Sequence, residues 1–298
     1  MVNGNYKITK YNVFKVFEPK ERVVMSLPFK DKIVQKLICD YILEPKLEPT
    51  FIYDNYASRK NKGTHFGLDR LEKFMHKFYR KKGHDGWFLK CDISKYFYSI
   101  DHKVLKKQLN KRVKNNKQLN LIYKIIDSTT SPGIPLGNQT SQFLALLYLS
   151  GMDHFIKEKL KIKYYGRYMD DFYLIHEDKE YLRYCLKEIR KYCKGLKLKL
   201  NNKTNIFPVK NGLDFLGFHT YLTETGKVIR KIRRKSKSNM KRKIKKYKKM
   251  YDKDKISKEK INQSFESWIN HASYGNCYYL INDMKEYYNK VFKEKVIK

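Results

Sequence analysis

The stretch Tyr165-Gly-Arg-Tyr-Met-Asp-Asp-Phe-Tyr-Leu-Ile175 places alternating apolar and aromatic residues on both sides of a polar centre, Asp170-Asp171. This pattern predicts a β-hairpin that carries the two carboxylates at its tip. Adjacent carboxylates repel each other and would weaken a purely structural turn, but they become favourable when divalent cations lie between them and a third carboxylate. An isolated acidic pair is more often a solvated turn, so the rest of the chain must decide.

A third carboxylate, Asp92, lies near the end of Trp87-Phe-Leu-Lys-Cys-Asp-Ile93, which has the composition of a buried strand. The alternative role for Asp92 is a cap for the turn that follows. If this strand is a neighbour of the hairpin in one sheet, Asp92 and Asp170 converge. Convergent carboxylates in a cationic protein suit two-metal phosphoryl transfer, in which one Mg²⁺ activates a primer 3′-hydroxyl and the other holds the nucleotide triphosphate and its pyrophosphate.

The composition indicates a globular protein with a polyanionic partner. The 298 residues are 41% hydrophobic, enough for one composite domain or two to three small ones. They include 66 Lys and Arg against 30 Asp and Glu, a formal charge of +36. An AT-rich genome explains Lys in place of Arg but not this excess. Nucleic acid is therefore the expected partner, and a membrane is not, because no basic segment has a continuous apolar face.

The five cysteines are scattered and form no Cys-x-x-Cys or Cys/His cluster, so the sequence predicts neither a disulfide framework nor a zinc site. No signal-peptide core or membrane-length apolar run is present. A reducing, cytoplasmic location in a bacterium, an archaeon or a phage-infected cell is the resulting expectation.

Apolar spacing and capping residues predict the remaining elements. Val23–Phe29 is expected to be extended, Pro45 to end the first helix, and residues 68–79 to form a second helix. The predicted N-terminal helix caps are Asp31, Asp101, Thr140 or Ser141, and Asp178. Residues 196–200 alternate like a strand, 201–204 form a turn, and a hairpin begins at Leu213 and turns near Gly226. This order predicts an α+β fold with a four-stranded antiparallel sheet backed by two helices.

The segment 227–250 contains fourteen Lys or Arg residues and no acid. A thin apolar stripe that includes Ile229, Ile232 and Ile244 predicts helices with one cationic face. A run of charge is usually a solvated surface, but the lack of compensating acids favours contact with phosphates. The aromatic tail that follows is expected to complete a small helical bundle.

Taken together, these motifs resemble those of a reverse transcriptase over nearly the whole chain. Phe88-Leu-Lys-Cys-Asp-Ile-Ser-Lys-Tyr-Phe97 is similar to the first catalytic motif of that family, and Tyr168-Met-Asp-Asp171 is similar to its signature. The resemblance implies two Mg²⁺ ions, with Mn²⁺ as a substitute. It assigns Asp92, Asp170, a supporting Asp171 and the backbone carbonyl of Ile93 as the metal ligands.

The resemblance also implies roles for residues outside the metal site. Phe97 would be the gate against a ribose 2′-hydroxyl, Lys203 in Asn202-Lys-Thr204 would help pyrophosphate leave, and Arg59 and Lys62 would contact the triphosphate. The primer-grip hairpin would consist of Phe215, Leu216, Gly217 and Phe218. The cationic segment would be the thumb, with nucleic-acid contacts from Arg230, Lys231, Arg233, Arg234, Lys241, Arg242 and Lys245.

The segment Gly133-Ile-Pro-Leu-Gly-Asn-Gln-Thr-Ser-Gln142 indicates the subtype, and Leu136, Gly137 and Gln142 would border the nucleotide. Aliphatic Leu136 and the Ser-Gln ending resemble reverse transcriptases of diversity-generating retroelements, whereas group II intron and retron enzymes usually have Gln and Ser-Pro. An apolar side chain in place of a hydrogen-bonding one would hold the nascent base pair less firmly. The resemblance implies copying that is error-prone at template adenines, a structured template RNA, and a small basic accessory variability protein that forms a ring.

The predicted organisation is a right-hand polymerase that takes dNTPs, primer and cDNA. Fingers span residues 1–86, with 110–132 also expected there; the palm spans 87–225 and the basic helical thumb 226–298. The absence of a maturase, endonuclease or RNase H extension is taken to disfavour an intact intron protein. Two alternatives stay open at this stage: a retron or phage-defence reverse transcriptase, and a non-catalytic RNA-binding protein on a polymerase fold. The complete carboxylate set argues against the second, because RNA binding requires cations rather than acids.

Overall fold

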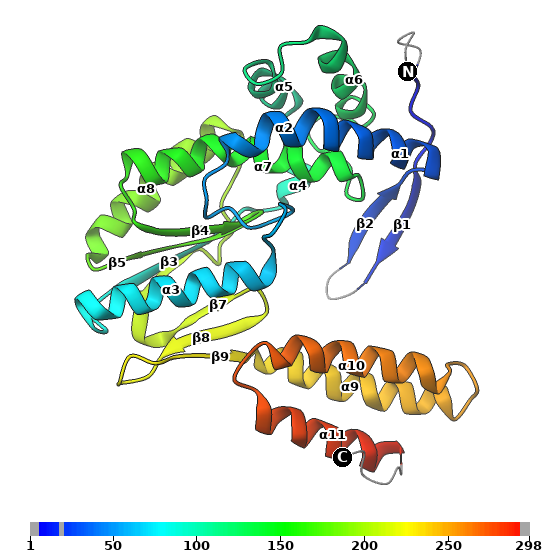
Figure 1. Ribbon diagram of the computed structural model, residues 1–298, viewed down its shortest axis with the longest axis vertical. Coiled ribbons are helices and arrows are strands. Elements are labelled where there is room, and N and C mark those ends of the chain that lie inside the picture. Colours follow the sequence, from blue (N-terminus) through cyan, green and yellow to red (C-terminus); the bar gives the residue numbers. More distant parts are fainter. Residues whose placement is uncertain (1–5, 18–20, 293–298) are drawn as a thin grey trace. The chain divides into compact units, whose positions relative to one another are not determined.

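The structure, a computed structural model, describes residues 6–17 and 21–292 (Figure 1). Its contacts divide the chain into two compact units, Met1–Gly67 with Gly86–Phe207 and Leu68–Asp85 with Pro208–Lys298. The functional boundaries near residues 86 and 225 stay predictions. Among the described residues no helix is both long and apolar enough to cross a membrane. All five cysteines are buried free thiols.

The first unit is built on a four-stranded sheet in the order β4-β5-β3-β6. Its strands are β3 (Trp87–Asp92), β4 (Tyr164–Tyr168), β5 (Asp171–His176) and β6 (Asn205–Pro208). β5 is antiparallel to both β3 and β4. The predicted α+β fold with a four-stranded palm-type sheet is therefore confirmed. The fourth strand is β6 and not residues 196–200, of which only Leu200 forms an isolated bridge, to Ile93.

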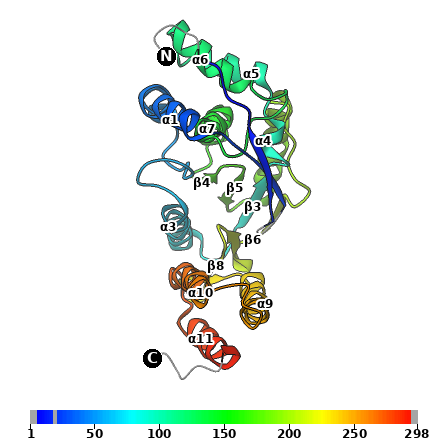
Figure 2. The same cartoon turned by 90° about the vertical axis from the view of Figure 1, so that its right-hand side faces the viewer.

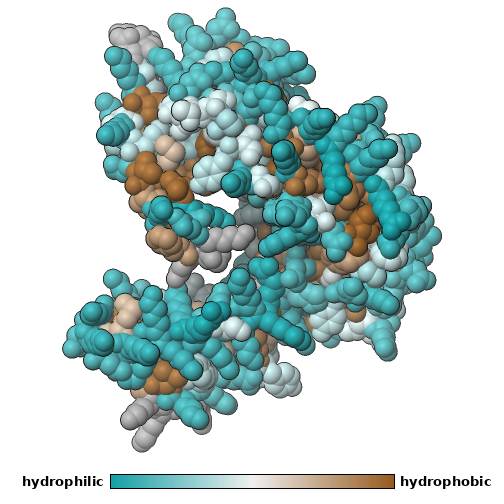
Figure 3. All heavy atoms as spheres, turned by 180° about the vertical axis from the view of Figure 1, so that it is seen from behind, coloured by the Kyte–Doolittle hydropathy of each residue, from teal (hydrophilic) through white to brown (hydrophobic). Residues whose placement is uncertain are grey.

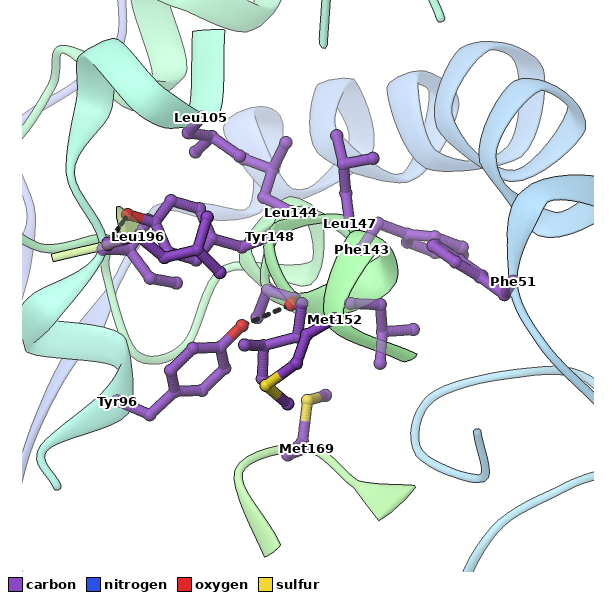
Figure 4. Close-up of a cluster of buried hydrophobic side chains, with 14 of the residues drawn as sticks. Phe51, Tyr96, Leu105, Phe143, Leu144, Leu147, Tyr148, Met152, Met169 and Leu196 are labelled. Carbon is purple, nitrogen blue, oxygen red and sulfur yellow. Dashed lines mark hydrogen bonds between the residues drawn. The ribbon is translucent and has the colours of Figure 1, made fainter. Parts of the chain in front are cut away.

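Helices α7 (Gln139–His154) and α8 (Lys179–Gly195) supply most of the core against this sheet. α8 contacts β3 and β5, and α7 contacts α8. α7 is apolar nearly all round and buried, so its neighbours enclose it on several sides. Figure 4 shows this cluster, in which Tyr96 and Met169 point toward the α7 side chains and the Tyr96 hydroxyl donates a hydrogen bond to the Ala145 carbonyl (2.5 Å).

The remaining helices of this unit surround α7. They are α1 (Phe29–Ile38), a π-turn (Cys39–Leu43), α2 (Glu44–Leu47), a 3₁₀ turn (Glu48–Thr50), α4 (Tyr96–Ser99), α5 (His102–Asn110), α6 (Asn116–Ile126) and a second π-turn (Phe155–Lys159). α1 and α5 both contact α7, and α6 contacts α5 (Figure 2). A separate antiparallel hairpin consists of β1 (Asn12–Val16) and β2 (Arg22–Ser26).

The second unit contains the three-stranded sheet β7 (Leu213–Phe215), β8 (Phe218–Leu222) and β9 (Val228–Ile232), after a 3₁₀ turn (Val209–Asn211). Its helices are α9 (Arg234–Tyr251), α10 (Lys258–Ser273) and α11 (Tyr278–Phe292), together with most of α3 (Thr64–Lys82). Ile244, Phe265 and Tyr288 belong to a common core. The cationic segment is therefore not wholly helical, because residues 228–232 complete a sheet before α9 begins.

The predicted helix caps Asp101 and Asp178 are confirmed, because each accepts a hydrogen bond from an amide in the first turn of its own helix. Asp101 accepts the Val104 amide (3.0 Å) and Asp178 accepts the Glu180 amide (2.7 Å). Asp31 is wrong as a cap: α1 starts two residues earlier, behind Pro28, and the buried Asp31 carboxylate instead accepts the Tyr6 hydroxyl (2.5 Å). A tertiary partner has replaced the local one.

Two other predicted boundaries were also wrong. α7 begins at Gln139 with Asn138 at its N-cap, and Thr140 is buried with its hydroxyl donating to the Gln35 side chain (3.3 Å). Ser141 is likewise buried inside the helix. Pro45 does not end the helical path, because it lies in the first turn of α2, where a missing backbone N–H is tolerated.

Candidate active site

The site is built at the end of two neighbouring strands. In the antiparallel register of β3 and β5, Asp92 lies directly opposite Asp171. Directly opposed like charges destabilise a strand pair. The strands are nevertheless fixed in this register because Phe88, Leu89 and Cys91 are fully buried on one and Phe172 and Leu174 on the other.

Asp170 lies in the turn between β4 and β5, next to both of these carboxylates. Its backbone carbonyl accepts the Ile93 amide (3.1 Å), which draws the turn toward the end of β3. The pKa of Asp170 is raised to about 6, mainly by burial and in addition by the charges of Asp92 and Asp171. Its own backbone amide and Arg22 act in the opposite direction. The predicted convergence of Asp92 and Asp170 is thus present, and their mutual repulsion is incompletely compensated.

Asp171 differs from Asp170 because it has a cation beside it. The Lys90 ammonium donates to the Asp171 carboxylate from the adjacent strand, and both side chains are partly buried. The two residues of the Asp-Asp pair therefore have different surroundings, with Asp170 the less compensated of the two.

Asn201 holds Asp92 from the other side, a role that sequence analysis missed. The Asn201 amide donates to the Asp92 carbonyl (2.7 Å), and the Asn201 side-chain nitrogen donates to the Asp92 carboxylate (3.3 Å). The Asn201 side-chain oxygen accepts the Lys203 amide (3.0 Å). Lys203 is exposed in this predicted turn. Asn201 therefore links the turn that carries Lys203 to the carboxylate site, and its place beside the recognised Asn-Lys-Thr motif was the available signal.

Arg22, the first residue of β2, is a second residue that sequence analysis missed. It is exposed, and its positive charge acts on Asp170, whose pKa it lowers. No local pattern connects residues 22 and 170. The signal that could have found it is a cation at the start of an extended segment within an otherwise apolar strand.

The β1–β2 hairpin is attached to the loop that carries Leu136. The Met25 amide donates to the Leu136 carbonyl (2.7 Å). Gly137 has φ +122°, and a Cβ there would lie 2.5 Å from the Met25 carbonyl oxygen. Only glycine fits this close approach without displacement. The loop is thereby fixed next to the hairpin that carries Arg22.

Phe97 is attached to the same loop. The Ile134 amide donates to the Phe97 carbonyl (2.9 Å), and the Gly133 amide donates to the Ile100 carbonyl (2.9 Å). Gln142, on the first turns of α7, accepts a hydrogen bond from the Ser58 hydroxyl (3.2 Å). Phe97, Leu136, Gly137 and Gln142 thus belong to one connected part of the first unit, which also contains Asp92 and Asp170.

Arg59 and Lys62 use their polar groups to hold their own loop. The Arg59 side chain is only 6% exposed; it pairs with Glu48 (2.7 Å) and donates to the Ile52 and Asn55 carbonyls (2.7 and 2.9 Å). The Lys62 ammonium donates to the Tyr53 carbonyl and lies over the Tyr53 ring. These bonds give both residues a structural role in holding their own loop. Arg59 is not retained as a triphosphate contact.

The proposed primer-grip residues form the tight turn between β7 and β8. Phe215 and Phe218 are buried in the core of the second unit. Leu216 (φ +48°) and Gly217 (φ +92°) form the turn itself and are half-buried. Only the backbone turn is thus available to a ligand, while the two aromatic rings hold it in place.

The cations of the basic segment fall into two groups. Arg230 is enclosed: its side chain is 7% exposed, donates to Glu72 (2.8 Å) and Asp69 (3.3 Å), and lies over Tyr274. It joins α3 to β9 and is not retained as a nucleic-acid contact. The other predicted contacts are exposed or half-exposed: Lys231, Arg233, Arg234, Lys241, Arg242 and Lys245. With ten Lys or Arg residues and no acid, α9 presents strong positive charge.

The carboxylate site fits a hard divalent cation. Among the described residues no group of three or more His, Cys, Asp or Glu side chains is arranged to hold a metal. Asp92 and Asp170 nevertheless supply anionic oxygen donors from adjacent strands, and the raised pKa of Asp170 reflects negative charge that a cation would compensate. Oxygen donors without a nearby thiolate suit Mg²⁺ or Mn²⁺ rather than zinc.

A large cavity in the described part of the chain lies away from the carboxylates. It has a volume of about 1510 Å³ and lies between the extended segment 6–13 and α6, with lysines 7, 10, 117 and 124 in its wall. Its lining includes none of the three carboxylates. Figure 3 shows that one face of the molecule is mainly hydrophilic, interrupted by hydrophobic patches.

The sheet is antiparallel, and it brings together carboxylates from a strand end and a hairpin tip within a strongly basic chain. This is the architecture of a nucleic-acid polymerase palm. A family model described as reverse transcriptase (RNA-dependent DNA polymerase) matches residues 9–220. The chain belongs to this family.

Curated relatives share the family at modest identity. The chain is 25% identical to Protein YkfC of Escherichia coli (strain K12) over 234 residues, 63% of this chain and 60% of that protein. It is 31% identical over 145 residues to the group II intron-encoded protein LtrA of Lactococcus lactis subsp. cremoris, 46% of this chain and 23% of that protein. The chain thus spans less than two thirds of the length of these relatives.

Solved telomerase structures share the fold. Apo telomerase from Candida tropicalis, truncated from its C-terminal domain, superposes with a TM-score of 0.57 at 16% identity, covering 74% of this chain and 55% of that one. Telomerase from Candida albicans, in complex with a fragment of telomeric RNA, gives a TM-score of 0.55 at 13% identity, covering 97% and 60%. These similarities concern the fold alone.

Proposed function

We propose that this chain is an active RNA-directed DNA polymerase that extends a primer on a structured retroelement RNA by two-metal nucleotidyl transfer. The single observation that carries the proposal is the meeting of Asp92 and Asp170 at adjacent strand ends, with the pKa of Asp170 raised to about 6. A protein that only binds RNA gains nothing from apposed carboxylates, because they repel phosphate.

In this proposal Asp92, Asp170 and the Ile93 backbone carbonyl hold the divalent ions, and Asp171 supports them. Bound Mg²⁺ or Mn²⁺ would supply Lewis-acid activation of the primer hydroxyl and charge stabilisation of the leaving pyrophosphate. The chain's own contribution is positioning and electrostatic stabilisation. Asn201 orients Asp92, and Arg22 and Lys203 place positive charge where a triphosphate would approach Asp170.

The substrate surfaces are assigned on the same basis. Phe97 borders the sugar, and Leu136, Gly137 and Gln142 border the nascent base pair. The turn at Leu216 and Gly217 supports the primer, and the exposed cations of α9 contact the phosphates of template, primer and cDNA. The similarity to a protein encoded by a group II intron supports an RNA template.

The proposal is tested by primer extension with dNTPs and Mg²⁺ on a primed RNA. Asp170→Asn should lower incorporation by at least about 1000-fold, because the variant loses an anionic group at the reacting centre. Asp283→Asn, an exposed position on α11, is the matched control and should retain activity. Full activity of Asp170→Asn would overturn the role of this carboxylate. Inactivity of the wild-type chain on every primed RNA would overturn the polymerase assignment.

For the subtype we propose a diversity-generating retroelement enzyme, whose copying is error-prone opposite template adenine and which works with a small basic ring-forming accessory protein. Support comes from the apolar Leu136 and the Ser141-Gln142 ending. Sequencing of cDNA from the native RNA, with and without the accessory protein, tests the subtype. Leu136→Gln should lower misincorporation opposite adenine, and an unchanged error rate would remove Leu136 from the explanation. A fixed, accurate cDNA would indicate the retron or phage-defence alternative.

A further inference from the structure

A fully buried ion pair lies behind the catalytic turn. The side chains of Arg167, on β4, and Asp153, in the last turn of α7, are both 0% exposed. Arg167 Nε donates to Asp153 Oδ1 (2.7 Å) and Nη2 donates to Oδ2, a two-pronged contact. The Tyr165 hydroxyl donates to the same carboxylate (2.6 Å). Three hydrogen bonds therefore hold Asp153, and its two-pronged contact fixes the orientation of the guanidinium.

The third arm of this guanidinium reaches the catalytic turn. Arg167 Nη1 donates to the Met169 carbonyl (2.9 Å), and the next carbonyl, that of Asp170, accepts the Ile93 amide (3.1 Å). Two consecutive carbonyls of the turn are thus held by two different donors. Met169 adopts φ +54°, a left-handed conformation that is unfavourable for a residue with a side chain. Such a conformation persists only where the surroundings impose it.

The backbone of Arg167 is fixed as well. Its amide donates to the Asp54 carbonyl (3.0 Å), and its carbonyl accepts the Tyr56 amide (2.9 Å). Burial by itself would lower the pKa of Arg167, but Asp153 raises it, so the guanidinium stays charged. Hydrogen bonds hold both the backbone and the side chain of Arg167, and its Nη1 donates to the turn.

A buried ion pair contributes little net stability compared with an apolar pair of similar size, so stability alone does not account for this arrangement. We propose that Arg167, held by Asp153, is a positioning residue that fixes the Met169–Asp170 turn in the conformation that presents Asp170 to Asp92. The kinetic consequence rests on the proposed polymerase function, whereas the geometric claim does not.

The test separates positioning from stability by removing both charges together. The double variant Arg167→Met/Asp153→Leu leaves no unpaired buried charge, and only the Tyr165 hydroxyl loses its acceptor. The variant should therefore fold, with a melting temperature lowered by the loss of that one hydrogen bond. It cannot donate to the Met169 carbonyl. Arg167→Lys is the second variant: it keeps the charge but lacks the fork that reaches Asp153 and Met169 together. Arg183→Met/Glu180→Leu, an exposed pair on α8, is the matched control.

Two readouts are compared in folded protein. Hydrogen exchange in metal-free protein should be at least about tenfold faster at residues 168–171 in Arg167→Lys and in the double variant, with the control unchanged. A tenfold faster exchange means that local opening of the turn costs about 1.4 kcal/mol less free energy. In primer extension, kcat should fall about 10- to 100-fold while KM for dNTP changes less than about threefold, since misplacement near the chemistry affects the transition state.

Each outcome decides the proposal. Wild-type exchange at 168–171 in either folded variant would overturn it, and so would wild-type kcat in the double variant. If the double variant does not fold, Arg167→Lys decides on the same readouts. If the wild-type chain itself is inactive, the polymerase function fails, but the exchange measurement still tests whether Arg167 holds the turn.

Discussion

Asp92 on β3 lies directly opposite Asp171 on β5, and Asp170 in the adjoining turn is drawn to the same strand end by a hydrogen bond between its carbonyl and the Ile93 amide (3.1 Å). Three carboxylates are thereby gathered in one place, but only one of them, Asp171, is held by the neighbouring Lys90. A site with this imbalance has capacity for added positive charge.

Asp170→Asn should stabilise the metal-free protein at pH 7.5. The pKa of Asp170 is raised from 3.8 to about 6, so the ionised carboxylate weakens the fold progressively as pH rises through that interval, and the full penalty is present above it. Removing the charge should raise the free energy of unfolding by up to about 3 kcal/mol. Denaturant unfolding in EDTA measures this. Added Mg²⁺ should then stabilise the wild type more than the variant, and an equal response of both proteins would contradict the metal assignment.

Asn201→Ala should reduce activity, because Asp92 loses the side chain that orients its carboxylate. Residues that hold a metal ligand from behind typically contribute about 10- to 100-fold to activity or metal affinity. The expected result is a loss of this size in kcat, with a higher Mg²⁺ concentration needed for half-maximal rate. Asn202→Ala, at the exposed neighbouring position, should leave both values unchanged. A normal Mg²⁺ dependence in Asn201→Ala would show that Asp92 needs no such support.

Arg22→Gln should weaken nucleotide binding, because Arg22 is the cation whose charge reaches Asp170 from the β1–β2 hairpin. Loss of one charge-assisted contact corresponds to about a tenfold rise in KM for dNTP. Steady-state primer extension gives this value. Lys15→Gln is the control, since Lys15 pairs with Glu21 (2.7 Å) on the same hairpin. If the two variants behave alike, the effect belongs to general charge and not to Arg22.

Arg242→Gln/Lys245→Gln should weaken RNA binding in a salt-dependent way. Both residues are exposed on α9. Each lost phosphate contact should make the slope of log K against log salt shallower by about 0.7–0.9. Filter binding or fluorescence anisotropy at several salt concentrations measures the slope. The same charge change at Lys103 and Lys107, exposed on α5, should alter the slope less. An unchanged slope for the α9 variant would remove this helix from the binding surface.

His154 should make stability depend on pH. Its Nε2 lies 2.9 Å from the Thr50 carbonyl and its Nδ1 lies 2.6 Å from the Glu158 carboxylate, so both nitrogens have acceptors and the charged ring is favoured. The Thr50 carbonyl is the main cause of the raised pKa of His154, and Glu158 and Asp153 raise it further against burial.

Because the folded pKa is raised, this stabilisation is fully present below about 6.5, the ordinary value, and is lost as pH rises through the folded pKa. Solvent screening keeps it within about 1 kcal/mol. The unfolding free energy of the wild type, minus that of His154→Gln, should therefore be larger at pH 5.5 than at pH 8.5. If the difference is the same at both pH values, the His154 ring does not change its protonation state in this range.

The sequence by itself determined the elements whose causes are local. A short apolar run set β3, alternating apolar and aromatic residues set the β4–β5 hairpin and its carboxylate tip, and the caps Asp101 and Asp178 bond to amides two or three residues away. These interactions lie within a few residues, so composition and spacing contain them. The sequence left the pairing of β3 with the hairpin as a condition for the site, and the structure meets that condition.

Only the tertiary structure decided what each charged side chain contacts. Lys90 engages Asp171, Arg167 meets Asp153, and Arg230 is buried against Glu72, each across a separation that no local pattern encodes. A cation in the sequence looks the same whether it faces phosphate or fills a buried ion pair. The difference is burial, because desolvation makes a partner obligatory inside the protein and leaves the exposed cations of α9 available to a ligand.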